Sequence, residues 1–339
     1  MNIRLIVVGF LLLSNAIAIS AYANKAEKTM LDDWSQTMRN LEFAPATNDK
    51  LYCHIKPRFR TSNEHYPHAD YLRQLASSQN IIVFVHGFIP DKLGGEHRLN
   101  GMINVWQEHI RIADEFEDVN YCVITWDTEY GHDDKNLTLG KLLSVLYMGI
   151  SDNRNTLSHR QAKVTLVGHS AGGNYIKYSE VFANKMMAIL KQTSNNFSKI
   201  FRKKIVTLGT PHLGTTKAES AQGLVLLGKV YAILAGDKNL NLSLDAFGLK
   251  AYSRGADRLR PVANNPPLRQ LNNEFIQHFP KRDLLAIGSP NDELVPLSSA
   301  IPAFAEGMML NLSHSQFLNP ISSPQFYRSI QSIYRGGQL

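Results

Sequence analysis

The chain has 339 residues, of which 44% are hydrophobic and 19% are charged, so it can bury one large core and has the composition of an ordinary globular enzyme. Its formal net charge of +7 comes from scattered Lys and Arg residues without interleaved aromatic residues, which argues against nucleic-acid binding. The mildly basic balance leaves peripheral contact with an anionic lipid surface as an alternative to a simply solvated surface.

The first 23 residues have the pattern of a secretory signal peptide. Arg4 gives a short basic start, residues 5–13 are apolar, and residues 21–23 fit the small-x-small rule for cleavage. We therefore expect export with cleavage after Ala23. A signal anchor is the alternative, which the shortness of the apolar run disfavours.

Two cysteines, Cys53 and Cys122, lie in strand-like runs. They are too few for a thiolate zinc cage, and the sequence contains no HExxH or similar ligand spacing, so we expect neither a metal nor another cofactor. An oxidising compartment would permit one disulfide, and two neighbouring buried thiols fit the sequence equally well.

Short apolar runs alternate with segments of helical length, as in a mostly parallel α/β sheet flanked by helices. The predicted strands are 81–85, 121–126, 164–167, 205–208, 284–287 and 308–312, with a leading strand at 51–59. The predicted helices are 26–39, 99–115, 137–148, 174–191, 267–278 and 324–334. Ser323 is a suitable N-cap for the last helix, and Pro324 suits its first position.

No clear strand occurs between Pro211 and about Ala263, which predicts an insertion in the sheet-forming pattern. Residues 221–235 within it are apolar nearly all round and must be buried. We interpret residues 215–263 as an inserted helical cap on a single domain of residues 24–339. The apolar segment fits a lid over an acyl-binding groove and an ordinary buried helix equally well.

Ser170 is the candidate nucleophile. It lies in a GxSxG motif that directly follows the apolar run 164–167 and precedes a helix-forming stretch. Such a turn from strand to helix is so sharp that only small residues fit beside the serine, and Gly168, Ala171 and Gly172 meet that requirement. The following helix would point its positive N-terminus at a developing oxyanion.

A serine nucleophile requires a base and an orienting carboxylate. Downstream of Ser170, the strand 284–287 runs into a turn with Asp292, and the strand 308–312 runs into His314. We therefore predict Asp292 as the orienting carboxylate and His314 as the general base. Glu293, beside Asp292, is the alternative carboxylate. His278 has the features of an ordinary surface or core histidine.

The strand 81–85 ends in His86 and Gly87, and this turn would bring a backbone N–H beside the serine. We predict that the amides of Phe88 and Ala171 form the oxyanion hole. His86 is interpreted as a structural residue that holds its loop. His169 is expected to pack beside the serine turn without taking protons.

Five segments together resemble the α/β-hydrolase superfamily, and specifically its lipase-like branch. They are FVHGF, GHSAGG, TLGTPHLGT at residues 207–215, the DELVP turn and LSHS, and the resemblance spans about residues 81–318. The segment at 207–215 resembles bacterial triacylglycerol lipases and GPI-inositol deacylase-like proteins. The resemblance implies the triad Ser170, Asp292 and His314, and the oxyanion hole Phe88 and Ala171. Glu293 stands where many relatives carry glycine. A bacterial host is favoured, with the protein in the periplasm or the medium.

These features predict a secreted serine carboxylester hydrolase, a lipase or esterase, that forms an acyl-enzyme on Ser170 and acts on a lipid or another acyl ester. A thioesterase or an acyltransferase could use the same residues. A hydrolase-like binding protein without turnover is the alternative of a different class, because a fold alone does not fix a function.

Overall fold

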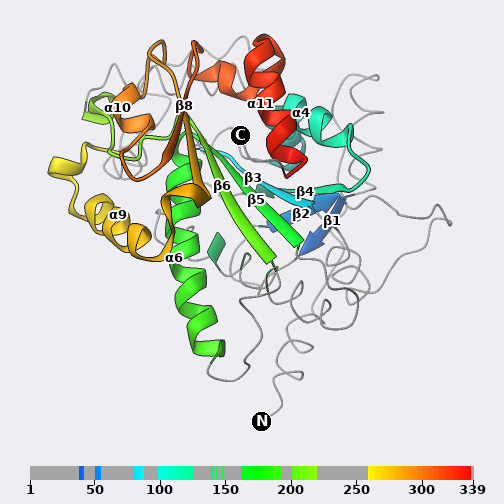
Figure 1. The fold of residues 1–339 in the computed structure, drawn as a ribbon, viewed down its shortest axis with the longest axis horizontal. Coiled ribbons are helices and arrows are strands. Elements are labelled where there is room, and N and C mark those ends of the chain that lie inside the picture. Colours follow the sequence, from blue (N-terminus) through cyan, green and yellow to red (C-terminus); the bar gives the residue numbers. More distant parts are fainter. Residues whose placement is uncertain are drawn as a thin grey trace.

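The computed structural model describes residues 38–41, 50–54, 80–87, 98–125, 162–191, 201–219 and 259–336, together with residues 139, 140, 143 and 147. In this part of the chain an eight-stranded sheet lies between two groups of helices (Figure 1). The predicted signal peptide, most of the predicted cap and Phe88 lie outside the described residues. Within the described ranges, no helix is both long enough and apolar enough to cross a membrane.

The sheet has the strand order β1-β2-β4-β3-β5-β6-β7-β8. Strands β3 to β8 run parallel to one another, and β2 runs antiparallel to both β1 and β4. This is the mostly parallel sheet predicted from the sequence. The strands are β1 (Met38–Leu41), β2 (Lys50–His54), β3 (Asn80–Val85), β4 (Val119–Thr125), β5 (Ala162–His169), β6 (Phe201–Leu208), β7 (Leu284–Gly288) and β8 (Glu306–Met309).

The predicted helices inside the described ranges are present, with ends that differ by up to three residues. Ser323 caps the last of them, since its side chain accepts a hydrogen bond from the backbone N–H of Phe326. Residues 139, 140, 143 and 147 are also helical, as predicted. The longer helices are α4 (Arg98–Asp114), α6 (Ala171–Lys191), α9 (Pro266–His278) and α11 (Pro324–Tyr334), and the short helix α10 spans Leu297–Ala300.

Two predicted elements differ from the structure. The end of the predicted helix 26–39 is wrong, because Met38–Leu41 pairs with β2 as strand β1. The last strand, predicted at 308–312, covers Glu306–Met309 instead. The backbone N–H of Leu312 donates to the side-chain oxygen of Ser289 at 2.9 Å and not to a strand carbonyl, so the chain leaves the sheet before that residue.

The sheet separates two apolar cores, and the alternation of β3 shows both. Ile81 and Val83 pack in the core that includes residues of α6 and α9, whereas Ile82 and Phe84 pack in the core that includes residues of α4 and α11. Figure 1 shows these two helix pairs on opposite faces. Burial on both faces explains why the central strands are continuous apolar runs in the sequence.

A disulfide joins Cys53 on β2 to Cys122 on β4. The two cysteines are direct partners in the antiparallel register of these strands. Of the two alternatives left open by the sequence, the structure has the bridge and not the pair of free thiols. It ties the antiparallel leading strand to the parallel part of the sheet.

The strand order reverses at β3, whose neighbours are β4 on one side and β5 on the other. At such a reversal the loops that follow adjacent strands diverge to opposite faces and leave a crevice at the carboxyl edge of the sheet, where α/β proteins bind their ligands. His86 and Gly87 follow β3 at this edge, and Ser170 follows β5. The fold therefore places the candidate nucleophile at the expected ligand position.

Candidate active site

Ser170 is the single residue between β5 and α6, and its backbone has φ = 55°, in the left-handed region. It is the one non-glycine residue with positive φ in the described part of the chain. This conformation costs about 1–3 kcal/mol and persists only where the surroundings enforce it. Here the Ser170 N–H donates to the carbonyl of Leu208 on β6 at 2.9 Å, which fixes the turn against the neighbouring strand.

Glycines make room for this turn. A Cβ atom on Gly168 would lie 2.6 Å from the backbone nitrogen of Gly173, and one on Gly172 would lie 2.6 Å from the carbonyl oxygen of His86. Real Cβ atoms essentially never approach that closely. The small residues of the motif are therefore required by the close approach of helix α6 to the ends of β5 and β3.

Asp292 and His314 form a buried pair. The distance from Asp292 Oδ2 to His314 Nδ1 is 2.8 Å, and both side chains are at most 1% exposed. Because the carboxylate can only accept, Nδ1 carries the proton and Nε2 presents a lone pair when the ring is neutral. Nε2 is buried and has no hydrogen-bond partner among the described residues. A histidine in this state can accept a proton from a hydroxyl group.

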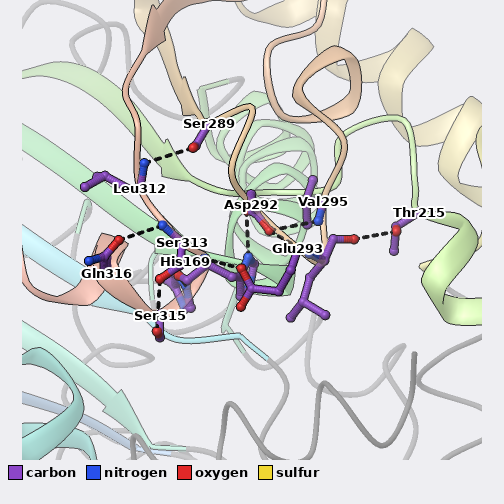
Figure 2. A network of polar contacts seen from close by, with 12 residues as sticks. His169, Thr215, Ser289, Asp292, Glu293, Val295, Leu312, Ser313, Ser315 and Gln316 are labelled. Atoms are coloured by element: carbon purple, nitrogen blue, oxygen red, sulfur yellow. Dashed lines mark hydrogen bonds and ion pairs between the residues drawn. The ribbon is translucent and has the colours of Figure 1, made fainter. Parts of the chain in front are cut away.

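The acid turn is fixed by its own backbone. The second oxygen of Asp292, Oδ1, accepts hydrogen bonds from the N–H groups of Leu294 and Val295 at 2.8 and 2.9 Å. The side chain of Thr215 donates to the carbonyl of Leu294 at 2.6 Å and joins the 207–215 segment to this turn (Figure 2). Asp292 is therefore held at both oxygens and has no freedom to turn from His314.

Ser289 joins the loop that carries Asp292 to the loop that carries His314. Its buried hydroxyl oxygen accepts from the backbone N–H groups of Asn291 and Leu312, each at 2.9 Å. Figure 2 shows the Ser289–Leu312 bond at the upper edge of the network. Ser289 was not predicted as a site residue from the sequence, although its place directly after β7 could have indicated it.

Glu293, the alternative orienting carboxylate, does not contact the ring of His314. Its Oε2 accepts from the backbone N–H of His314 at 3.1 Å. His169 reaches the same residue from the other side, since its Nε2 donates to the carbonyl of His314 at 3.0 Å. The rings of His169 and His314 have their centroids 4.8 Å apart. Burial in the first place, and the nearby His314 in the second, hold the pKa of His169 well below its ordinary value, so its ring stays neutral.

The structure pairs two of the three predicted triad residues, Asp292 and His314, and links Ser170 to this pair through neighbouring residues. Ser170 follows His169 directly, and His169 is bonded to His314. On the other side, a Cβ atom on Gly209 would lie 2.9 Å from Asp292 Oδ2, and the preceding Leu208 accepts the Ser170 N–H bond. The serine turn, the base and the carboxylate therefore meet at the carboxyl ends of β5, β6 and β7.

The predicted oxyanion hole is described in part. Ala171 is the first residue of α6, so its N–H lies at the positive end of a 21-residue helix. Phe88 lies outside the described residues, and Gly87 is the last described residue before it. The Nδ1 atom of His86 donates to the carbonyl of Gly87 at 2.6 Å, which fits its interpretation as a residue that holds this loop.

A second buried polar network, which the sequence analysis missed, lies behind the 207–215 segment. The Nζ atom of Lys177 donates to Asn272 Oδ1 at 2.6 Å, and Asn272 Nδ2 donates to the carbonyl of His212 at 2.8 Å. Asn174 likewise donates to the carbonyl of Pro211 at 3.0 Å. Helices α6 and α9 therefore support this segment through side chains that bind its backbone.

Within the described ranges, no group of three His, Cys, Asp or Glu side chains is arranged to hold a metal ion. The pair of Asp292 and His314 offers a carboxylate and one ring nitrogen, Nε2, which is buried and has no partner among the described residues. The arrangement suits proton transfer to and from a hydroxyl group, with charge stabilisation by Asp292.

A family model described as "Putative serine esterase (DUF676)" matches residues 76–305. No curated protein matches the sequence. Among solved structures, a lipase of Bacillus licheniformis is 16% identical, with 75% of this chain and 93% of that chain covered and a TM-score of 0.45. A carboxylesterase of Bacillus subtilis is 11% identical, with 93% and 97% covered and a TM-score of 0.45. An esterase of Pyrococcus furiosus is 13% identical, with 93% and 95% covered and a TM-score of 0.46.

Proposed function

The chain belongs to the serine esterase family whose model spans residues 76–305, and we propose that it hydrolyses carboxylic esters through an acyl-enzyme on Ser170. One observation carries this proposal. The pair of Asp292 and His314 leaves His314 Nε2 buried and without a partner among the described residues, and the backbone carbonyl of His314 is bonded to His169, the residue directly before Ser170 in its strained turn. A serine in that position has the base that it needs for activation.

In the first half of the reaction, His314 Nε2 takes the proton of the Ser170 hydroxyl group while Oγ attacks the ester carbonyl carbon. The carbonyl π electrons move to oxygen and give a tetrahedral oxyanion. Asp292 stabilises the imidazolium that forms and keeps its Nδ1–H directed away from the serine. The oxyanion then collapses, the bond to the alkoxide breaks, and His314 Nε2–H donates its proton to the leaving alcohol.

In the second half, water replaces the alcohol. His314 Nε2 removes a proton from water, the hydroxide oxygen attacks the acyl carbon, and the bond to Ser170 Oγ breaks as Oγ takes back a proton from Nε2. The N–H groups of Ala171 and Phe88 are the proposed donors to the oxyanion in both halves. Each such donor contributes about 3 kcal/mol in the transition state of an acyl transfer.

The test is hydrolysis of p-nitrophenyl esters from acetate to palmitate by the wild type and by Ser170→Ala. Loss of turnover in a variant that unfolds at the same temperature as the wild type is the expected result, together with loss of labelling by a fluorophosphonate. Ser329→Ala is the matched control, because Ser329 lies in α11 and its hydroxyl group bonds to Gln325 of the same helix. Full activity of Ser170→Ala would exclude the acyl-enzyme at this residue.

The same ester series separates the substrate classes. Turnover of long chains supports a lipase-type enzyme with an acyl site, and turnover of short chains alone supports an esterase. Preferential cleavage of an acyl thioester, or transfer of the acyl group to an added alcohol, would favour a thioesterase or an acyltransferase instead. A protein that is labelled on Ser170 without turnover of any ester would have to act on another acyl compound.

Export is part of the proposal and rests on the sequence of residues 1–23. Expression of the full chain in a bacterium, followed by mass determination of the protein from the periplasm and the medium, tests it. A mass that matches residues 24–339 is expected. A full-length product in the membrane fraction would favour the signal anchor, and binding of the mature protein to anionic vesicles would support contact with a lipid surface.

A further inference from the structure

We propose that His169 and Glu293 are positioning residues, which hold the backbone of His314 and so fix the distance from its ring to Ser170. This inference rests on the proposed role of His314 as the base. Neither residue takes or gives a proton in the reaction. They affect the reaction only because they fix the position of His314.

Three contacts from two different segments hold His314. Asp292 accepts from the ring at 2.8 Å, Glu293 accepts from the backbone N–H at 3.1 Å, and His169 donates to the backbone carbonyl at 3.0 Å. The two backbone contacts are needed because the local structure supplies none there. β8 ends at Met309, and the short 3₁₀ turn that follows the base begins at Ser315.

Each backbone contact ties His314 to a different part of the site. His169 is the residue directly before Ser170, so its bond joins the base to the nucleophile without passing through the carboxylate. Glu293 is the residue directly after Asp292, so its bond joins the base to the acid turn a second time. The ring of His169 is 1% exposed, which shields its bond from competition by water.

The chemistry gives a reason for two such contacts. An ester carbonyl must lie within about 3–3.5 Å of Oγ while Nε2 accepts the proton, and a displacement of about 1 Å costs about 100-fold in rate. A base on an irregular loop reaches this accuracy only when its supporting contacts are fixed. His169 in its neutral form with the proton on Nε2 is a donor to a carbonyl, and Glu293 is an acceptor for an N–H, so each matches the backbone group that it meets.

The experiment compares removal of each contact with its conservative replacement. His169→Leu and Glu293→Ala remove the donor and the acceptor, whereas His169→Gln and Glu293→Gln keep an amide N–H or an amide oxygen near the same place. We expect kcat for p-nitrophenyl butyrate to fall about 10- to 100-fold in the first two variants with KM within about twofold. The Gln variants should recover most of that loss.

Gln316→Ala is the matched control. Gln316 Oε1 also accepts from a backbone N–H of this loop, but that N–H belongs to Ser313, at 2.8 Å, and not to His314, and Gln316 is exposed. It should keep kcat within about twofold of the wild type. Thermal unfolding of every variant is measured in parallel, and a loss of kcat in a variant with unchanged unfolding temperature is a loss of positioning and not of folding.

The double variant His169→Leu with Glu293→Ala sharpens the test. Because both contacts hold the same residue, their effects on kcat should not multiply. The proposal is overturned if both single variants keep kcat within about twofold, or if the Gln replacements are as slow as Leu and Ala. Failure of the proposed function would give a different result, namely retained turnover in Ser170→Ala. The two failures can therefore be told apart.

Discussion

His109 and His314 are both buried, yet their surroundings prepare them for different tasks. His314 has a carboxylate on Nδ1 and no partner on Nε2 among the described residues. His109, in α4, has neutral partners on both nitrogens, the hydroxyl group of Tyr334 at 2.7 Å and the carbonyl of Phe317 at 2.9 Å. Burial lowers the pKa of His109 to about 4. A buried histidine is suited to proton transfer when a carboxylate stabilises its charged form and one nitrogen is left for the substrate.

His109 is also linked to His314 indirectly, through the backbone that follows His314. The carbonyl that accepts the His109 bond belongs to Phe317, three residues after His314, so His109 fixes the short turn that follows the base. Helices α4 and α11 therefore support the base loop from the core, while Glu293 and His169 hold it from the site. Loss of the inner support should reduce stability, whereas loss of the carboxylate should reduce the rate.

Asp292→Asn should have the largest effect. An amide cannot stabilise the imidazolium and permits the wrong ring tautomer, so kcat should fall about 1,000- to 10,000-fold with KM nearly unchanged. Steady-state hydrolysis of p-nitrophenyl butyrate measures this loss. His109→Gln is the control and should keep kcat within about threefold. A smaller loss in Asp292→Asn than in Glu293→Ala would transfer the role of orienting carboxylate to Glu293.

Lys177 extends the comparison to a buried amine whose hydrogen-bond partner among the described residues is an amide and not a carboxylate. Its Nζ donates to Asn272 and lies 5.6 Å from the centre of the Phe304 ring, and burial lowers the pKa of Lys177 to about 7. The unfolded chain binds this proton more tightly, with a pKa of about 10.4. Between pH 7 and 10.4 the free energy of unfolding should therefore rise with pH, by up to about 5 kcal/mol, and the destabilisation should be complete below pH 7.

Lys177→Met should remove this dependence, because the side chain keeps its length and loses its charge. Urea unfolding of wild type and variant at pH 7.5, 8.5 and 9.5 measures the difference, with Lys217→Met as a control in an exposed lysine of the 3₁₀ helix Thr216–Glu219. The stability gain of Lys177→Met should be greatest at pH 7.5 and shrink as the pH rises. A gain that does not change with pH would mean that Lys177 binds its proton equally well in the folded and the unfolded chain, so that burial does not lower its pKa.

The sequence predicted the sheet and the serine turn because both depend on local signals. Buried central strands require continuous apolar runs, and the turn at Ser170 requires small residues at fixed positions, so both requirements are visible in a single segment. Asp292 and His314 could be placed because each follows such a run. The ends of β1 and β8 could not, since Met38–Leu41 is a strand only through its pairing with β2.

The contacts that support the site could not be predicted, because they join residues that lie far apart in the sequence. His109 binds groups that are 208 and 225 residues further along the chain, and Lys177 binds a group 95 residues away. In α4 and α6 they have the sequence pattern of ordinary helix residues. Glu293 was recognised as a carboxylate near His314, but the sequence does not tell whether such a group meets a ring or a backbone N–H. That choice depends on how two distant loops approach each other.

His109→Gln should change acid stability with little change in rate. The folded pKa of His109 is about 4, below its ordinary value of about 6.5, so between these values the unfolded chain holds the proton and the folded chain does not. The free energy of unfolding should therefore fall as the pH falls from 6.5 to 4, by about 3 kcal/mol for this group. Below pH 4 the folded and the unfolded chain both hold this proton, so His109 should no longer make the free energy of unfolding depend on pH.

Burial also lowers the pKa values of His169 and His212, so wild type should lose stability on acidification through several groups. The quantity to compare is therefore the difference in the free energy of unfolding between wild type and His109→Gln. Urea unfolding at pH 7, 6, 5 and 4.5 measures it. The variant should be less stable than wild type at pH 7, because Gln cannot bond to both Tyr334 and Phe317. The difference in the free energy of unfolding between the two proteins should become smaller toward pH 4.5. His278→Gln, at the exposed end of α9, is the control. A stability difference of constant size would mean that His109 takes up its proton over the same pH range in the folded and the unfolded chain, so that burial does not lower its pKa.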